Sequence, residues 1–350
     1  MSWGSATPLR AGKIRRRIFC VSPPLISSSW KRLRLERRDR PAGRIFRGSP
    51  HRGAGRRGEE SKIRMTTAID VDASSLADEP VRRAPAKGKI LRYRADRRSV
   101  TYTLGLLLLH VAAFLLAPAW VALLLVVPFS IAGMFVAPLN HHHQHLNTFH
   151  AAWLNRVYEI ALALQTGLGP YGWVLHHNLG HHRNYLNQRP HPQPDESRWT
   201  RADGATMNRL EYTVKLLLSH QIDIYRVGRS YPRHWRSFLL MKIPLWGVLG
   251  GLLYLNPLNA LLVFLLPGLV VLAHTCWATY EHHAGYHGTS HYDASTNRTS
   301  PVYNFLTCNL GYHTAHHKRP GTHWSLLPHL HEEIKHEIPD EMILPTFFGR

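Results

Sequence analysis

Two long apolar blocks constrain the fold of this chain more than any other feature. Residues 101–140 contain no Lys, Arg, Asp or Glu, and residues 238–280 contain a single charged residue, Lys242. A helix needs about 20 apolar residues to span a bilayer, so each block is long enough for two helices. The breaks fall near Pro118–Trp120 and at Asn256–Asn259. We predict an all-α integral membrane fold whose four spans form two hairpins, at about residues 100–117, 120–139, 238–255 and 259–279.

The alternative to membrane spans is a pair of buried helical hairpins in a soluble core. Two nearly charge-free blocks of this length argue against it, because soluble helices carry polar residues on their outer face. His110 lies in the middle of the first span and is expected to pack between helices.

Basic residues set the predicted orientation. Six Lys or Arg residues stand between Lys87 and Arg98, with Asp96 as the only acid, and neither hairpin tip is charged. Because Lys and Arg near span ends mark the cytoplasmic side, both termini are expected in the cytoplasm. Residues 141–237 and 281–350 then form a helical cap on that face, and the membrane is expected to be the bacterial inner membrane. Residues 151–164 fit equally an interfacial helix and a helix packed within this cap.

The formal net charge of +21 is concentrated at the N-terminus, where the first 64 residues hold 18 Lys and Arg against four acidic residues. Residues 1–90 are expected to be a disordered basic segment, and residues 1–64 are expected to lie upstream of a true start at Met65. Residues 91–335 are predicted to form the membrane domain and residues 336–350 a C-terminal tail. No nucleic-acid partner is predicted, because no recognition fold accompanies the basic segment.

Histidines gather in four clusters that fall in the two segments assigned to the cap. The clusters are His141–His145, His177–His182, His282–His287 and His313–His317. Helical spacing of four residues places two imidazoles on one face, and neutral imidazole binds iron, copper, zinc and nickel. About nine histidines are too many for one ion, so the pattern predicts a site for two metals. The three cysteines are too widely separated for a Cys-type metal site.

The combination of these clusters with four spans resembles the membrane fatty acid desaturase and hydroxylase superfamily. The segment from Asn309 to His317 is similar to the last histidine box of desaturases. The middle box has three residues between its first His and the His pair, and this spacing and the segment Tyr280–His282 resemble alkane monooxygenases instead. The resemblance covers about residues 90–335, so residues 91–335 are expected to be a desaturase-like domain.

The resemblance implies a di-iron centre with O2 as co-substrate and no catalytic side chain beyond the metal centre. At the third cluster, His283 and His287 are alternatives to His282. Asn178, Asp195, Glu281 and Asn309 are expected around the ligands, where carboxylates and amides orient imidazoles or hold water. The implied ligands are His141, His145, His177, His181, His182, His282, His313, His316 and His317.

A long acyl or alkyl substrate is expected to enter from the bilayer between the spans. Small and aromatic residues of the spans fit the wall of its tunnel and equally fit helix packing or the membrane interface; they are Gly133, Trp246, Gly250, Gly251 and Trp277. Two electrons must come from outside the chain, so a ferredoxin or a small haem protein with its reductase is implied as a partner. Such a donor would dock on the cytoplasmic face beside basic residues that give a positive surface, namely Arg183, Arg189, Lys318 and Arg319. Contact with lipid head groups is the alternative role of these residues.

The predicted function is that of an oxygen-dependent fatty acid (acyl-lipid) desaturase. A hydroxylase and a terminal-alkene-forming fatty acid decarboxylase of the same superfamily are alternatives that the sequence does not separate. A histidine-rich metal transporter is a third alternative, but it would need polar ligands at the bilayer midplane. The spans offer little beyond His110 and His274 for this purpose.

Overall fold

A computed structural model describes residues 86–188 and 195–348. The expected disorder of the N-terminal segment therefore lies almost wholly outside the described residues, as does Arg189. The predicted fold class is confirmed: the described chain is mostly helical and contains four helices long and apolar enough to cross a membrane. These candidate spans are Arg94–Leu116, Ala119–His145, Pro232–Leu255 and Pro257–His283.

The two hairpins break where the sequence predicts. The backbone is extended at Ala117 and Pro118, and it is non-helical at Asn256, directly before the helix that begins at Pro257. A proline disfavours the helical conformation in the residue before it. The helices nevertheless run past the expected ends of the spans. The helix α2 (Ala119–His145) continues six residues beyond position 139, and α8 (Leu266–His283) continues four beyond 279. A span of 27 residues is ~40 Å long at 1.5 Å per residue, more than the ~30 Å of hydrocarbon. Both helices therefore carry their last turns, and the histidines on them, beyond the apolar layer.

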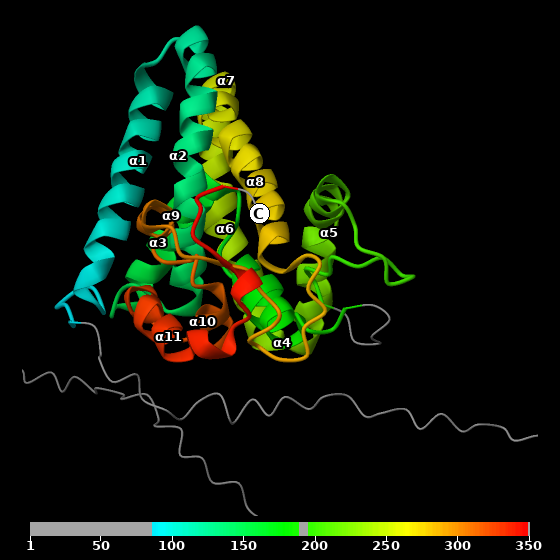
Figure 1. The fold of residues 1–350 in the computed structure, drawn as a ribbon. Coiled ribbons are helices and arrows are strands. Elements are labelled where there is room, and N and C mark those ends of the chain that lie inside the picture. Colours follow the sequence, from blue (N-terminus) through cyan, green and yellow to red (C-terminus); the bar gives the residue numbers. More distant parts are fainter. Residues whose placement is uncertain (1–85, 189–194, 349–350) are drawn as a thin grey trace, which may run out of the picture. The chain divides into compact units, whose positions relative to one another are not determined.

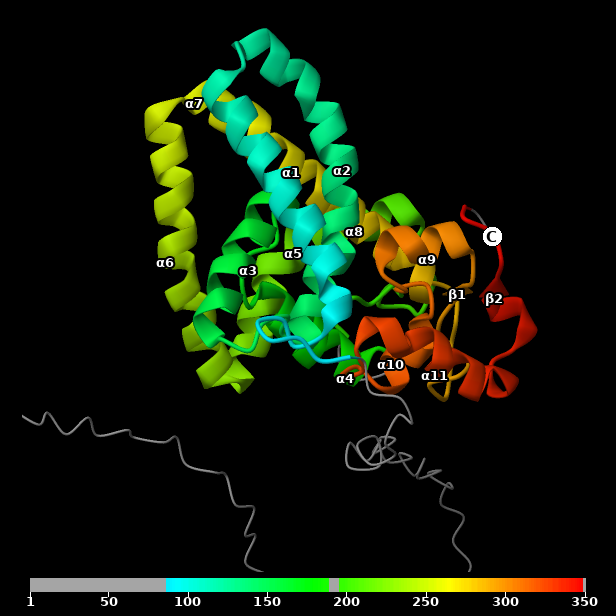
Figure 2. The same cartoon turned by 90° about the vertical axis from the view of Figure 1, so that its left-hand side faces the viewer.

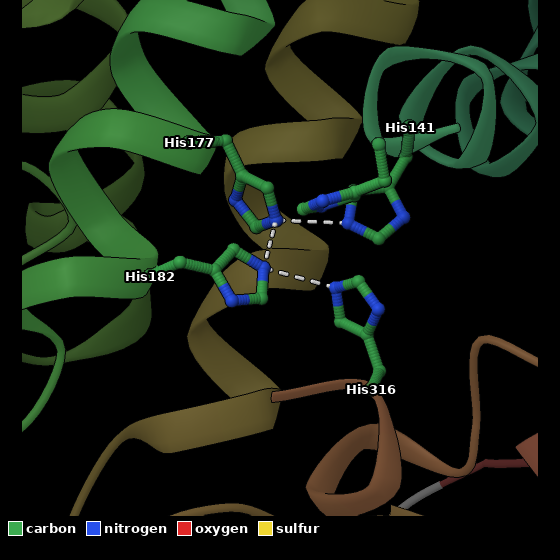
Figure 3. Close-up of side chains that lie close together, drawn as sticks. His141, His177, His182 and His316 are labelled. Atoms are coloured by element: carbon green, nitrogen blue, oxygen red, sulfur yellow. Dashed lines mark hydrogen bonds between the residues drawn. The ribbon is translucent and has the colours of Figure 1, made fainter. Parts of the chain in front are cut away.

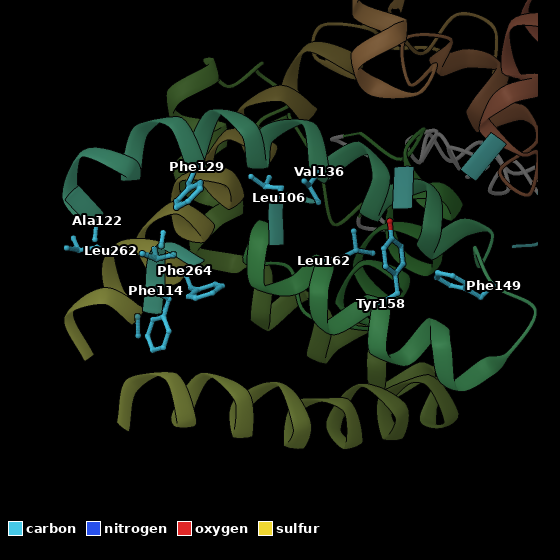
Figure 4. Close-up of a cluster of buried hydrophobic side chains, with 13 residues drawn as sticks. Leu106, Phe114, Ala122, Phe129, Val136, Phe149, Tyr158, Leu162, Leu262 and Phe264 are labelled. Carbon is cyan, nitrogen blue, oxygen red and sulfur yellow. The ribbon is translucent and has the colours of Figure 1, made fainter. Parts of the chain in front are cut away.

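The packed face of α1 (Arg97–Leu116) shows how the bundle forms. Its buried residues Thr103, Leu106, His110 and Ala113 recur every three or four positions, which places them on one helix face. Leu106 and Ala113 join a core with Phe114, Phe129, Leu162, Val263 and Phe264, drawn in Figure 4. The opposite face exposes leucines such as Leu108 and Leu115, as expected for a surface against lipid.

His110 packs within this core, because its ring stacks on Phe129 with centroids 3.9 Å apart. Its Nδ1 donates to the backbone carbonyl of Leu106 at 2.9 Å. It is therefore a buried packing residue in the described bundle, as the sequence suggests.

Other elements gather around one end of the candidate spans (Figure 1). In chain order they include α3 (Ala152–Thr166), the π-helix η2 (Val174–His181), α4 (His182–Asn184), α5 (Arg209–Ser230), α9 (Pro301–Thr307), α10 (His313–Lys318) and α11 (Leu327–Ile334). The remaining elements are η1 (Arg94–Asp96), α6 (Pro232–Leu255), α7 (Pro257–Ala260), the π-helix η3 (Leu261–Leu265), β1 (Asn297–Arg298), η4 (Trp324–Leu326), η5 (Lys335–Glu337), η6 (Asp340–Met342) and β2 (Ile343–Leu344). Figure 2 shows α6 along the side of the bundle.

The helix α3, for which the sequence left two placements open, packs into the bundle and also keeps an exposed apolar face. Tyr158 and Leu162 are buried in the core, and the Tyr158 hydroxyl donates to Thr103 Oγ1 at 3.0 Å. Trp153 and Val157 on its other side are more than half exposed.

The segment set apart as a C-terminal tail packs against the cap over residues 336–348. Ile338 and Met342 are buried in a cluster with Leu327 and Leu330. The short strand β2 pairs in parallel with β1, so that Asn297 lies beside Ile343. The chain after position 335 is therefore part of the folded unit, because these apolar side chains have a surface to bury against.

Candidate metal centre

The last turns of α2 supply the first two histidines of the site. His141 and His145 lie one helical turn apart, with ring centroids 4.8 Å apart, and both are enclosed by the cap. His143 points elsewhere, because its Nδ1 lies 2.9 Å from Thr148 Oγ1 and its Nε2 3.4 Å from Glu159. The spacing of four residues thus selects which members of this histidine-rich turn face inward.

The middle box lies on a π-helix instead of the regular α-helix that its spacing suggested. The wider turn of η2 brings residues five apart toward one face. The Nε2 atoms of His177 and His182 are consequently only 3.0 Å apart. His181 leaves the same segment in a different direction, and its Nε2 lies 3.2 Å from that of His283.

The short helix α10 divides its three histidines in the same way. His316 reaches toward the middle box, with its Nε2 3.0 Å from that of His182. His313 and His317 share the other face, with Nε2 atoms 3.2 Å apart.

The three candidate histidines of the third cluster, at and beyond the end of α8, have different surroundings. The Nε2 of His283 is 3.1 Å from those of both His313 and His317. The neighbouring residue His282 instead lays its ring flat on that of His313, with centroids 3.9 Å apart and an angle of 13°. His287 lies outside this cluster with its ring edge against Trp199. Of the three, only His283 therefore aims a nitrogen at the other histidines.

The histidines form two adjoining groups, which we call group 1 and group 2. Group 1 consists of His141, His145, His177, His182 and His316. Group 2 contains His181, His283 and His317. Within each of these sets, one ligand atom per residue lies within 4.8 Å of every other. Figure 3 shows four members of group 1 pointing toward one another from separate parts of the chain. We add His313 to group 2, because its Nε2 contacts those of His283 and His317.

The hydrogen bonds behind group 2 show that this arrangement suits a cation. His283 Nδ1 donates to the Ala294 carbonyl at 2.8 Å, and His181 Nδ1 donates to Asp195 Oδ1 at 3.1 Å. A neutral imidazole with its proton on Nδ1 presents a bare lone pair at Nε2. When both rings are neutral, their Nε2 atoms, 3.2 Å apart, face each other with lone pairs. A metal ion between such atoms removes their mutual repulsion, so the residues fit a metal.

Burial favours the neutral form of several of these imidazoles. Removal from water lowers the pKa of His177, His182 and His316 well below the ordinary value, and the neighbouring histidines lower it further. The same causes lower the pKa of His313 and His317. Neutral imidazole is the form that binds metal, so burial favours the ligating state of these five histidines.

Asp195 is the one acid of the predicted outer layer that the structure places against a clustered histidine. It is buried and accepts hydrogen bonds from His181, Gln188 Nε2 and the Ser197 N–H. Although burial opposes its ionisation, His181 and Ser197 lower the pKa of Asp195 below its usual value. A carboxylate behind a ligating imidazole fixes the tautomer and the ring orientation, and this is the position that Asp195 occupies.

The other predicted outer-layer residues have different partners. Asn178 Nδ2 donates to the Gln144 carbonyl at 2.9 Å and thereby joins the middle box to α2. Asn309, with a left-handed backbone, donates to the Trp324 carbonyl. Glu281 forms ion pairs with Arg209 and Arg298. None of these hydrogen bonds or ion pairs is made to a histidine of the two groups.

Tyr185 is a site residue that the sequence analysis did not identify. Its buried ring lies 4.2 Å from that of His317 and 5.4 Å from that of His283, and its hydroxyl hydrogen-bonds to His291. Its position four residues after His181 places it on the same helical face, which is the signal that could have identified it.

A cavity of about 650 Å³ adjoins both groups. His141 and His177 of group 1 and His181 and His313 of group 2 line it together with apolar side chains of α2 and α8. Trp277 is among its walls, whereas Gly133 packs closely against Val271 and Gln165. Its volume lies in the range of ~300–1,000 Å³ typical of ligand sites.

Comparison with protein families gives a match to one family model, fatty acid desaturase, over residues 116–347. The matched region holds all nine histidines of the two groups and three of the four candidate spans in full. Comparison with curated proteins and comparison with solved structures gave no match.

Proposed function

This chain belongs to the fatty acid desaturase family, and we propose that it introduces a double bond into a long alkyl chain held in its cavity. The family and the four candidate spans make it a desaturase-like oxidoreductase of the membrane. The observation that carries the finer proposal is the cavity of about 650 Å³ whose walls include histidines of both groups. An alkyl chain in this cavity would lie beside the metal centre.

We assign the ligands of two iron ions to the nine histidines of groups 1 and 2. His141, His145, His177, His182 and His316 would hold one ion, and His181, His283, His313 and His317 the other. This set is the one that the resemblance implies, except that His283 replaces His282. The support for the exchange is the aim of His283 Nε2 toward His181, His313 and His317.

The reaction removes two hydrogen atoms from neighbouring methylene groups, which yields two protons and two electrons. O2 accepts these and two further electrons and protons from outside, and the products are an alkene and two water molecules. When bound, iron supplies the activation of O2 that an unactivated C–H bond requires. In the alternative hydroxylation, one C–H bond becomes C–OH, and the same external electrons produce one water molecule.

The protein's own contribution is to orient the histidine rings and to hold the alkyl chain beside them. Asp195 and the Ala294 carbonyl fix the rings of His181 and His283 before any ligand binds. The apolar walls, among them Phe135, Trp173 and Leu310, exclude water and align the alkyl chain beside the histidines. Such positioning converts an encounter into a near-unimolecular step.

We infer that the two external electrons come from a partner protein, because the three cysteines of the sequence do not form the Cys-x-x-Cys pairs of a rubredoxin-like segment. A ferredoxin or a small haem protein would dock on the cap, which we place in the cytoplasm on the basis of the positive-inside rule. Arg183, Lys318 and Arg319 lie in the described part of the cap.

The proposal is tested by expressing the full chain in a bacterial host and analysing its fatty acids and hydrocarbons by gas chromatography–mass spectrometry. New internal double bonds are expected with the wild type and His336→Ala, an exposed control, but not with His316→Ala. Hydroxy acids or terminal alkenes that form with the wild type and His336→Ala, but not with His316→Ala, would identify the reaction as hydroxylation or decarboxylation instead of desaturation. A product that persists in His316→Ala would overturn the metal-centre proposal.

A further inference from the structure

A second, smaller cavity adjoins the middle histidine box. Its volume is about 40 Å³, and residues of η2, α5 and α8 line it. We call it the small cavity, and we call the cavity of about 650 Å³ the large cavity. Both cavities are lined by the same four residues at one side, which are Trp173, His177, Thr275 and Thr279. The small cavity therefore lies directly behind His177, a member of group 1.

Two buried nitrogen atoms on side chains that line the small cavity have no hydrogen-bond partner among the described residues. They are Trp173 Nε1 and His176 Nε2. His176 is only 6% exposed, and its ring packs against that of His220 with centroids 4.9 Å apart. A buried donor or acceptor without a partner costs free energy, so such atoms normally bond to protein or to ordered water. Both nitrogens thus favour a polar ligand in this cavity.

Two hydroxyl groups add acceptors to the same lining. Thr275 Oγ1 donates to the Val271 carbonyl at 2.8 Å, and Thr279 Oγ1 donates to the Thr275 carbonyl at 2.7 Å. A hydroxyl group that donates its proton keeps lone pairs with which it can accept. A buried water molecule typically makes about two to four hydrogen bonds. The indole N–H, the imidazole nitrogen and the two hydroxyl oxygens can supply them.

The size of the small cavity also suits water. A cavity needs roughly 10–15 Å³ to hold one water molecule, so about 40 Å³ has room for roughly three. Dry protein cavities are lined by aliphatic and aromatic carbon. An apolar molecule in the small cavity would leave Trp173 Nε1 and His176 Nε2 without partners, and an alkyl chain would not fit.

We propose that the small cavity binds ordered water and takes up the water that the reaction releases beside the histidines. This inference rests on the proposed function for the source of that water, since each new double bond is accompanied by two water molecules. The large cavity is lined mainly by apolar side chains and would hold the alkyl chain, so it offers a water molecule few partners. The common wall at Trp173 and His177 places such partners next to group 1.

A crystal structure of the metal-loaded full chain, at a resolution that shows water, tests the site without reference to turnover. We expect density at about 2.7–3.2 Å from Trp173 Nε1 and from His176 Nε2. In His176→Leu, the water molecule beside position 176 should be lost. A small cavity without density for water beside either nitrogen would overturn the inference.

Filling the small cavity is a second test, made in solution. Cys276 is a buried wall residue, and Cys276→Leu adds carbon atoms that displace water and leave both nitrogens unpartnered. The thermal midpoint should therefore fall, whereas filling a dry cavity raises it. Because overpacking also lowers stability, the same change is made in His176→Leu. With that nitrogen removed, Cys276→Leu should be less destabilising. Equal losses in both backgrounds would indicate overpacking and contradict bound water.

Steady-state kinetics test the role in water release. Release follows the irreversible reaction, so Cys276→Leu should lower kcat and KM together, while kcat/KM and iron content stay near the wild-type values. Thr275→Val removes one acceptor and keeps the shape, so it should lower kcat less. Thr213→Val is the matched control. The Thr213 hydroxyl also donates to a carbonyl one turn earlier, but Thr213 lines neither cavity, so its kcat should equal that of the wild type.

Each outcome decides the inference. Ordered water at both nitrogens, with a lower kcat and an unchanged kcat/KM in Cys276→Leu, supports it. Ordered water with a wild-type kcat in Cys276→Leu would refute the role in release. A dry small cavity in an enzyme that forms alkene or alcohol would refute the inference and leave the proposed function intact. Ordered water in a protein that forms neither product would refute the proposed function, and with it the source of the released water.

Discussion

His177 and His182 are five residues apart in the sequence, yet their Nε2 atoms lie 3.0 Å from each other. The contact depends on the π-helix η2, because positions five apart in a regular α-helix with 3.6 residues per turn point in clearly different directions. The same segment sends His181 into group 2. One turn of irregular helix therefore supplies imidazoles to both groups, in agreement with the tendency of π-helical turns to occur at functional sites.

Removal of one histidine from group 1 should release metal. We expect His182→Ala to lower the iron content from about two atoms per chain to about one or fewer, since a two-metal site loses an ion when its ligand set is incomplete. Inductively coupled plasma mass spectrometry of the purified protein measures this. His336→Ala, on the exposed surface, should keep the wild-type content.

Substitution of His283 and of His282 should have different effects. His283→Ala removes a nitrogen aimed at three other histidines and should reduce bound iron as much as His182→Ala does. His282→Ala removes a ring that stacks on His313 and lines the cavity, so it should change turnover while iron content stays near the wild-type value. The reverse pattern of iron contents would restore His282 as the ligand.

Asp195→Asn should weaken metal binding without removing a ligand. The carboxylate orients His181 through Nδ1, and loss of such a partner typically costs about 10–100-fold in metal affinity. Competition with a chelator measures the affinity. Asp293→Asn is the matched control, because Asp293 accepts hydrogen bonds from Thr289 and Ser290 in a loop. An affinity that is unchanged in Asp195→Asn would contradict the orienting role.

A larger side chain in the cavity should shorten the alkyl chain that fits. Ala278 lines the cavity on α8, and Ala278→Phe adds a ring to a space that holds the substrate. We expect a product profile shifted to shorter chains, measured by gas chromatography of reactions with mixed C12–C18 acids. Ala112→Phe, on an exposed position of α1, should leave the profile unchanged.

Stability should fall as the pH drops below about 6.5. Burial lowers the pKa of His220 to about 3, so in acid the unfolded chain binds a proton that the folded chain does not. The contribution of His220 to the free energy of unfolding is fully present above the unfolded pKa of ~6.5. It decreases by about 2 kcal/mol between pH 6.5 and pH 5. The thermal midpoint of His220→Gln, measured by tryptophan fluorescence, should fall less over this range than that of the wild type. Parallel curves would show that His220 does not contribute.

Much of the site follows from local spacing, which a sequence displays directly. The pairs His141–His145 and His313–His317 share a face through the spacing of four residues, as predicted. The partner of Asp195 did not follow from spacing, because Asp195 and His181 are separated by 14 residues and meet only through the fold. The packed C-terminal segment was also unexpected, since its buried residues Ile338 and Met342 are too few to form a recognisable pattern.

The sequence by itself determined that this is a four-span membrane protein of the fatty acid desaturase family, because charge-free blocks and histidine spacing are properties of the chain alone. Only the tertiary structure decided how the histidines divide between two groups and that His283, not His282, faces the others. Adjacent residues on a helix point about 100° apart, so the choice between them depends on the rotation of α8 about its axis. That rotation is set by packing against α2 and α5 and by the Ala294 carbonyl, which lie far away in the sequence.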